Sequence, residues 1–314
     1  MEYVHTPVLA GPALQYLIPD TAHPYMIDCT LGEGGHSALF LEKYPFLNVT
    51  GLDRDETIMA KAITRLGGYG ERFTAVNTWF DAFLETYEGP APSIILFDLG
   101  ISIFHYVESH RGFSFSKSER LDMRLDASAR TDAFHVVNTY SEQDLSRIIF
   151  LYGEERYARR IARAICTSRS EGEIVYSDQL ASIIYHAVPA NYRFQRIHPA
   201  TRTFQALRIE VNGELERIVP SLHRAIDILA PGGYLGVISF HSLEDRPVKH
   251  LLKEREKGCI CPPKAPICTC GKTSDISIIT KKPVTADEAE CEANPPSRSA
   301  KLRVARKKGE ETDV

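Results

Sequence analysis

The sequence predicts an α/β fold, in which a parallel Rossmann-like sheet is interrupted by an inserted helical domain. Over residues 1–100, short apolar runs alternate with amphipathic helical patterns, which is typical of βαβ units. A glycine-rich turn at residues 30–35 follows the first apolar run. The run that should supply the fifth strand comes only at residues 234–240, far beyond the reach of an ordinary crossover.

Five short runs of apolar and β-branched residues are expected to form the sheet. Their length and composition are those of buried strands. They are residues 25–28, 48–53, 73–76, 93–98 and 234–240. Helical patterns begin near His36, cover residues 55–66 and precede the fifth run at residues 214–229. Because helices separate the runs, the strands should lie parallel.

The chain between the fourth and fifth strands exceeds the 30 or so residues of a single crossover by roughly a hundred. Ser141 to Asp144 resembles a capping box, and helical patterns follow at residues 154–169 and 178–188. We therefore expect a core made of residues 1–105 and 212–314. Residues 106–211 should form an inserted helical domain.

The sequence beyond the fifth strand predicts a mixture of elements that complete the core. Residues 241–257 have a helical pattern. Residues 276–281 and 301–306 are expected to be final edge strands. Residues 285–298, which are acidic and then rich in Pro and Ser, should form a surface loop.

Composition and charge exclude several classes of protein. The chain is 43% hydrophobic with a net charge of −4, so nothing global indicates a polyanion partner, although a local basic face can still bind one. No apolar run reaches the roughly 18 residues of a membrane span, and the first residues lack the pattern of a secretory signal. Seven cysteines, an odd number, argue against a disulfide scaffold. We expect a cytoplasmic protein without a membrane partner.

Three features at the ends of early strands predict a nucleotide-like cofactor. Glycines occupy positions 32, 34 and 35 after the first strand, Asp53 ends the second and Asp98 ends the fourth. In an open parallel sheet these ends form the ligand crevice, and an acid after the second strand commonly binds ribose hydroxyls. The glycines do not have the spacing of a dinucleotide fingerprint, so a cofactor with an adenosine and no pyrophosphate fits better than NAD.

At this point the sequence strongly resembles a known family. The resemblance rests on the strings DCTLGEGGHS, GLDRD, ILFDLGIS, RGFSF, LDMRLD, YGEERYARRIARAI, HPATRTFQALRIEVN, APGGYLGVISFHSLEDR and NPPSRSAKLRVA, and it extends from His5 to about Arg306. The chain is identified as a member of the MraW/RsmH family of bacterial small-subunit ribosomal RNA cytosine-N4 methyltransferases. The resemblance implies a class I (Rossmann-like) methyltransferase core, S-adenosylmethionine as methyl donor with S-adenosylhomocysteine as product, and a cytosine of 16S ribosomal RNA as acceptor.

The resemblance also implies a set of cofactor contacts. They are Gly34, Gly35, His36, Asp53, Phe80, Asp98 and, at the position of a family glutamine, His105. This last position departs from the family, because Ile103-Phe104-His105 stands where relatives have Ser-Pro-Gln. Phe80 suits packing on an adenine. Without the resemblance, a core position would be the preferred interpretation of Phe80. Asp98 is the catalytic candidate: it either accepts a hydrogen bond from the cytosine amine or only orients the cofactor.

RNA contacts are expected from the inserted domain, which is therefore the predicted RNA-recognition domain. Its helical segment at residues 154–169 is rich in arginine, and the segment 192–196 interleaves aromatic and basic residues. Candidate substrate-binding residues are Arg193, Phe194, Arg202 and, just after the fifth strand, His241. A solvated arginine face and a helix-capping role for His241 are the alternatives. The expected partner is 16S ribosomal RNA or the small ribosomal subunit, and monomer and homodimer both fit the sequence.

Two close cysteine pairs stand apart from this site. Cys259 and Cys261 are followed by Cys268 and Cys270, and four thiolates at this spacing can hold tetrahedral zinc. A reduced, proline-rich surface loop is the alternative. Two rival functions also fit the sheet and the glycine turn: a nicotinamide-dependent oxidoreductase, and a non-catalytic RNA-binding or assembly factor with a vestigial cofactor site.

Overall fold

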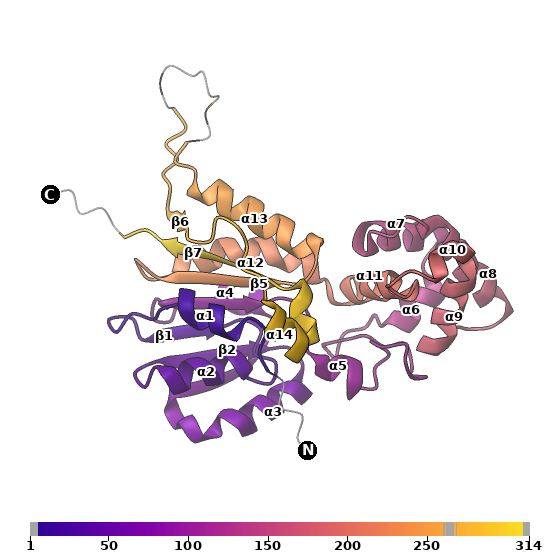
Figure 1. Cartoon of the computed structure of the whole chain (residues 1–314), viewed down its shortest axis with the longest axis horizontal. Helices are drawn as coiled ribbons and strands as arrows, with labels where there is room; N and C mark the ends of the chain where they lie inside the picture. The colour runs from indigo at the N-terminus through magenta and orange to yellow at the C-terminus, as the bar shows by residue number, and fades with distance from the viewer. Residues whose placement is uncertain (1–5, 260, 262–266, 268, 310–314) are drawn as a thin grey trace. The chain divides into compact units, whose positions relative to one another are not determined.

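The computed structural model describes residues 6–259, 261, 267 and 269–309. It divides into two compact units (Figure 1). The core unit runs as far as Gly100 and resumes at Glu216, and the helical unit comprises Ile101–Leu215. Each unit has its own hydrophobic core.

The core unit is built on a seven-stranded sheet in the order β3-β2-β1-β4-β5-β7-β6. The strands are β1 (Tyr25–Asp28), β2 (Asn48–Asp53), β3 (Phe73–Asn77), β4 (Ile94–Asp98), β5 (Tyr234–Ser239), β6 (Ile276–Ile278) and β7 (Lys301–Lys307). The first five are parallel, whereas β7 runs antiparallel to both β5 and β6. The predicted α/β class and its five parallel strands are confirmed, and the carboxyl ends of β1, β2, β4 and β5 share one edge.

The prediction of β7 as an edge strand is wrong, because β6 pairs with its outer side and makes β7 an interior strand. The charged residues that alternate with apolar ones along β7 are typical of an edge strand. Arg303 of β7 is only 8% exposed, since its guanidinium donates to both carboxylate oxygens of Asp245, at 2.6 and 3.0 Å. An ion pair therefore allows a charged side chain to lie inside the sheet layer.

Helices cover both faces of the sheet (Figure 1). One face carries α1 (Ala10–Tyr16), α2 (Gly35–Lys43) and α3 (Glu56–Leu66), and the other carries α12 (Glu214–Ile228) and α13 (Ser242–Glu256). A core of Phe40, Met26 and Leu96 with their neighbours fills the first interface. Burial of these side chains, at about 1.5–3 kcal/mol each, is the main stabilisation of the layer.

The segment predicted as a surface loop at residues 285–298 is helical instead, which corrects that expectation. It forms α14 (Glu288–Ala293) and a 3₁₀ turn at Pro295–Ser299. The Asp287 carboxylate accepts the backbone N–H of Glu290 at 2.8 Å and so caps α14. Glu290 in turn accepts the N–H of Leu9 at 2.6 Å, which holds the helix on the core.

The helical unit surrounds a separate core that includes Ile148, Ile161 and Leu207. Its main helices are α6 (Ala133–Thr139), α7 (Glu142–Gly153), α8 (Ala158–Glu171), α9 (Ser177–Ala187) and α11 (Ala200–Asn212), with short helices α5 (Ile103–Val107) and α10 (Ala190–Arg193). Ser141 caps α7 as predicted, because its Oγ accepts the N–H of Asp144 at 3.1 Å.

Helix α8 begins later than the sequence pattern suggests. Glu154 adopts a left-handed conformation (φ 48°) and ends α7, so the chain must turn before the next helix starts. The buried Glu155 then accepts the N–H of Tyr157 at 2.8 Å within this turn. No helix in the described residues has both the length and the apolar character needed to cross a bilayer.

Candidate active site

Two carboxylates meet where β1 and β4 end. Asp28 is 1% exposed and accepts hydrogen bonds from Ser37 Oγ at 2.7 Å and from the Thr30 N–H at 3.3 Å. Thr30 Oγ1 in turn accepts the N–H of Asp98 at 2.6 Å, which ties β4 to the turn after β1. Burial raises the pKa of Asp28, and the hydrogen bond from Ser37 only partly offsets this effect.

His36, in the first turn of α2, faces Asp98 across this edge. Its Nε2 lies 3.5 Å from Asp98 Oδ2, and its side chain is 6% exposed. Burial opposes the charged imidazolium, but the carboxylates of Asp98 and Asp28 outweigh burial and raise the pKa of His36. Within the described part of the chain, the buried Asp98 Oδ1 and His36 Nδ1 have no hydrogen-bond partner. Buried polar atoms of this kind can form hydrogen bonds to a polar ligand.

The acid at the end of β2 organises the glycine turn. Asp53 accepts the Gly32 N–H through Oδ2 and the Asp55 N–H through Oδ1, both at 2.9 Å. Gly32 has φ +53°, and a Cβ built on it meets nothing nearer than Ile58 Cδ1 at 4.0 Å. The turn is therefore held by Asp53, and the positive φ of Gly32 favours glycine at this position.

The other two glycines serve protein packing. A Cβ on Gly34 would lie 2.8 Å from Leu66 Cδ1, and one on Gly35 would lie 3.2 Å from Pro7 Cβ. Gly34 also has φ +75° and caps α2, a conformation that other residues rarely adopt. The missing side chains here let α2 approach its neighbours, while their backbone is still at the carboxyl edge of the sheet.

Phe80 lies at the start of α4 (Phe80–Glu85) and is half-buried. Its ring makes an edge-on contact with Phe97 of β4, with centroids 5.4 Å apart. Both flanking residues contact Arg217 of α12: its guanidinium lies 4.2 Å from the Trp79 ring centroid and pairs with Asp81. These contacts fix the helix start, so one ring edge is anchored in the core.

Comparison with known proteins identifies the family of the chain. The model of the MraW methylase family matches residues 2–308. The chain belongs to this family. It is 52% identical to a ribosomal RNA small subunit methyltransferase H of Treponema denticola, over 98% of both chains. It is 43% identical to a protein of the same name from Persephonella marina, over 96% of this chain and 99% of the other.

Among solved structures, the chain is similar to a ribosomal RNA methylase from Streptococcus thermophilus, with a TM-score of 0.40 and 9% identity over 91% of this chain and 87% of that one. Membership of the MraW methylase family confirms the predicted resemblance and the predicted class, an S-adenosylmethionine-dependent methyltransferase with a class I core. The alternative of a nicotinamide-dependent oxidoreductase is therefore wrong.

The residues at the sheet edge fit S-adenosylmethionine. Asp53 offers carboxylate oxygens for ribose hydroxyls, Gly32 presents its backbone without a side chain, and Phe80 presents a half-buried ring beside β4. Carboxylates at this edge would suit the positive charge of a sulfonium. These groups thus agree with the methyl donor that an MraW methylase uses.

Two further predicted site residues, His105 and His241, make local contacts. His105 belongs to the helical unit, on α5, where it is 4% exposed and packs against the rings of Phe104 and Phe113. His241 lies just before α13, and its Nε2 is 2.9 Å from Oε1 of Glu244. Glu244 Oε2 accepts the N–H groups of Phe240 and His241, so this pair caps α13. Cofactor or RNA contact by either histidine stays a prediction.

Two of the candidate RNA contacts in the helical unit differ in exposure. Phe194 is 83% exposed. Arg193 donates to the carbonyls of Val188 and His186 and lies 5.1 Å from the Tyr185 ring centroid. Phe194 is therefore available to a partner, whereas part of Arg193's hydrogen-bonding capacity is used within the unit.

Two arginines of α11 form hydrogen bonds within the unit. Arg202 donates to the Glu154 carbonyl at 3.1 Å. Arg208 is 8% exposed and forms a two-pronged pair with Glu214, at 2.9 and 2.8 Å. Arg208 therefore stabilises the unit from within and does not offer its guanidinium to RNA.

Sequence patterns did not indicate the residues that connect the acids. Asp28, Thr30 and Ser37 form the network beneath Asp98. The string DCT, which begins at the last residue of the first strand, was the available signal, because polar residues at a parallel strand's carboxyl end commonly face the site. Of the four cysteines proposed to hold zinc, Cys259, Cys261 and Cys270 lie together, and Cys268 is outside the described residues.

Proposed function

We propose that the protein transfers a methyl group from S-adenosylmethionine to the N4 amine of a cytosine in 16S ribosomal RNA. The observation that carries the proposal is Asp98: a buried carboxylate oxygen, Oδ1, is without a hydrogen-bond partner among the described residues, at the carboxyl end of β4. The names of relatives that are up to 52% identical over nearly the whole chain support the substrate class.

For this reaction the protein must align the cytosine amine with the methyl group and supply a proton acceptor. The lone pair of a cytosine amine is delocalised into the ring, so N4 is a poor nucleophile that benefits from an acceptor for its N–H. When bound, S-adenosylmethionine supplies an already activated methyl group. Asp98 Oδ1 would accept the N–H hydrogen bond of N4 and then the proton that nitrogen loses as it gains the methyl group.

His36 positions this acceptor. The Asp98 carboxylate and the His36 imidazole are 3.5 Å apart, and the raised pKa of His36 favours its protonated form. The attraction between the imidazolium and the carboxylate holds the Asp98 side chain in place. His36 is therefore a positioning residue, and Asp53 is the residue that holds the glycine turn for the cofactor.

RNA recognition is assigned to the helical unit. Exposed Arg159, Arg160 and Arg163 lie on α8, and Arg156 just before it lies 4.9 Å from the centroids of both the Tyr157 and Tyr192 rings. Arginines contact phosphates, and exposed rings such as that of Phe194 stack on unpaired bases.

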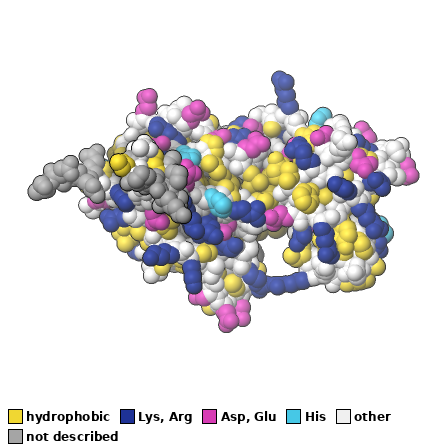
Figure 2. Space-filling model, turned by 90° about the horizontal axis from the view of Figure 1, so that it is seen from above, with side chains coloured by type: hydrophobic (Ala, Val, Ile, Leu, Met, Phe, Trp, Pro, Cys, Tyr) yellow, Lys and Arg dark blue, Asp and Glu magenta, His cyan; other side chains and the backbone are white. Residues whose placement is uncertain are grey.

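The basic groups act locally. Both signs of charge occur on the face shown in Figure 2, and the net charge is −4. RNA binding therefore depends on local clusters of basic residues, such as the arginines of α8. The small ribosomal subunit, in the cytoplasm, is the expected partner.

The test is methyl transfer to RNA from cells that lack the protein. Purified protein, labelled S-adenosylmethionine and small subunits from such cells should yield N4-methylcytidine in 16S ribosomal RNA, identified by nucleoside mass spectrometry. Asp98→Asn should lower turnover by about 10²–10⁴-fold, the usual range for a lost acid–base group, with S-adenosylhomocysteine affinity unchanged. The matched control, Asp20→Asn, changes an exposed acid that accepts only the N–H of Ala22.

Three results would count against the proposal. If no label enters the RNA, the protein is not a ribosomal RNA methyltransferase, and the assembly-factor alternative gains support. If the label is found on another atom, the N4 assignment fails. If Asp98→Asn loses cofactor affinity and turnover in equal measure, Asp98 only orients the cofactor.

A further inference from the structure

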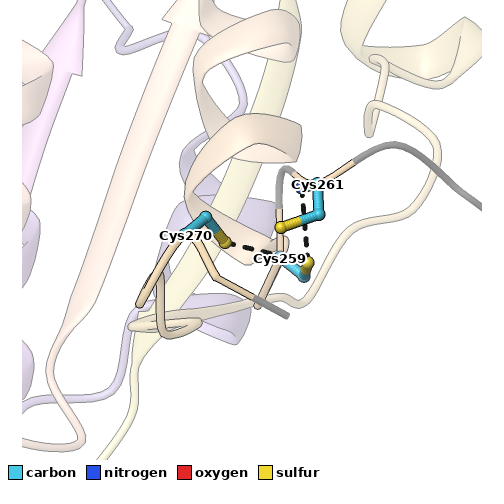
Figure 3. Close-up of side chains that lie close together, drawn as sticks. All are labelled: Cys259, Cys261 and Cys270. Carbon is cyan, nitrogen blue, oxygen red and sulfur yellow. Dashed lines mark hydrogen bonds between the residues drawn. The ribbon is translucent and has the colours of Figure 1, made fainter. Parts of the chain in front are cut away.

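A cluster of three thiols lies outside the methyltransferase site, in the segment between α13 and β6. Cys259 and Cys261 follow the C-terminus of α13, and Cys270 precedes β6 (Figure 3). The three Sγ atoms all lie within 4.8 Å of one another. Residues separated along the chain thus point their side chains at one small volume, which Figure 3 shows directly.

The distances fit a metal site and do not fit a disulfide. Cys270 Sγ is 3.7 Å from Cys259 Sγ, whereas a disulfide needs about 2.05 Å. The six described cysteines form no disulfide. Thiolates bound to one tetrahedral zinc at about 2.3 Å are separated by about 3.8 Å, so the Cys259–Cys270 distance requires almost no movement.

The backbone around the cluster also has the character of a thiolate site. The Cys261 N–H donates to Cys259 Sγ at 3.3 Å, which stabilises negative charge on that sulfur. The chain on either side is already held: Arg255 near the end of α13 pairs with Asp275 just before β6, and Glu254 lies 3.7 Å from Lys272. The two parts of the chain that carry the thiols, after α13 and before β6, are therefore held together independently of any ion.

We propose that Cys259, Cys261 and Cys270 bind one zinc ion, which links the chain after α13 to the chain before β6. Soft thiolate ligands favour Zn²⁺ over the hard cations Mg²⁺ and Ca²⁺, which take oxygen ligands. Three thiolates occupy three tetrahedral positions, and a ligand that these residues do not supply takes the fourth. The ion is structural: its binding energy stabilises the link between these two parts of the chain, and it takes no part in methyl transfer.

The proposal is tested on the full chain, purified under reducing conditions. Elemental analysis should find about one zinc per chain, and cobalt substitution should give the thiolate charge-transfer and tetrahedral d–d absorption bands. Cys259→Ser, Cys261→Ser and Cys270→Ser should each weaken zinc binding by at least about tenfold. The matched controls Cys166→Ser and Cys291→Ser change cysteines outside the cluster and should keep full zinc content.

One further measurement keeps the outcome independent of folding and of methyl transfer. S-adenosylhomocysteine affinity, measured on the same samples, should be unchanged in all five variants, which shows that the core is folded. Protein that is free of zinc under reducing conditions and gives no cobalt bands overturns the proposal, whether or not oxidation then links Cys259 to Cys270. Cluster variants that retain zinc as well as the controls do also overturn it.

Discussion

Replacing Asp53 by alanine should weaken both the glycine turn and cofactor binding. Its carboxylate accepts the N–H groups of Gly32 and Asp55, each at 2.9 Å. A hydrogen bond to a charged group contributes about 1.5–3 kcal/mol when buried, but Asp53 is only half-buried and water can reach the amides in the variant. We therefore expect Asp53→Ala to lower the free energy of unfolding by about 2 kcal/mol in total.

The same change should also weaken cofactor binding. In the variant, ribose hydroxyls lose a charged acceptor and the Gly32 turn loses its restraint, so S-adenosylhomocysteine affinity should fall by about 10–100-fold, or about 1.4–2.8 kcal/mol. Asp53→Asn keeps one oxygen for an amide and should recover part of the stability. The surface control Asp20→Ala removes an exposed acceptor of the Ala22 N–H and should leave both quantities unchanged.

The assays are urea unfolding and calorimetric titration with S-adenosylhomocysteine, on all four proteins. The reasoning is refuted if Asp53→Ala binds S-adenosylhomocysteine as tightly as the wild type while its unfolding free energy falls as expected. That result would make Asp53 a turn-stabilising residue only, and it would remove the second strand from the proposed pocket.

Gly112→Ala should destabilise the helical unit by about 2–4 kcal/mol, because φ is +72° and the new Cβ would lie 2.4 Å from the Arg120 carbonyl oxygen, whereas Gly67→Ala, with nothing within 4 Å, should be neutral in thermal unfolding. A neutral Gly112→Ala would contradict this. His36 has a raised folded-state pKa, so its stabilising contribution is complete below its unfolded pKa and is lost as pH rises through the folded pKa. The difference in unfolding free energy between wild type and His36→Gln should therefore shrink as the pH rises above about 6.5, the ordinary pKa of histidine, and a growing difference would exclude the interaction with Asp98.

Strand positions in the core could be predicted because the central strands are uniformly apolar. Ile94, Ile95 and Leu96 of β4 are fully buried, and burial on both faces gives the continuous run that identifies a parallel strand. The place of β7 could not be predicted in this way. Its alternating charges fit an edge strand, and only the ion pair of Arg303 with Asp245, distant in sequence, explains an interior position.

The candidate site was predicted in part. Asp53 and Asp98 have a local signal, since each ends a strand, whereas only the family resemblance indicated His36. The network of Asp28 and Thr30 beneath Asp98 depends on contacts between different elements, which periodicity does not report. The role of the glycines was also only partly predictable, because the space that Gly34 leaves is filled by Leu66 from α3.

Hydrogen exchange of the full chain with and without S-adenosylhomocysteine tests the central claim most directly, because it reports where the ligand binds independently of turnover. We predict slower amide exchange in residues 30–36, 53–55 and 98–100, at the carboxyl edge of the sheet. The segment at residues 269–275, beside the cysteine cluster, should exchange at its original rate. Protection confined to other segments, with residues 30–36 and 98–100 unaffected, would contradict the account.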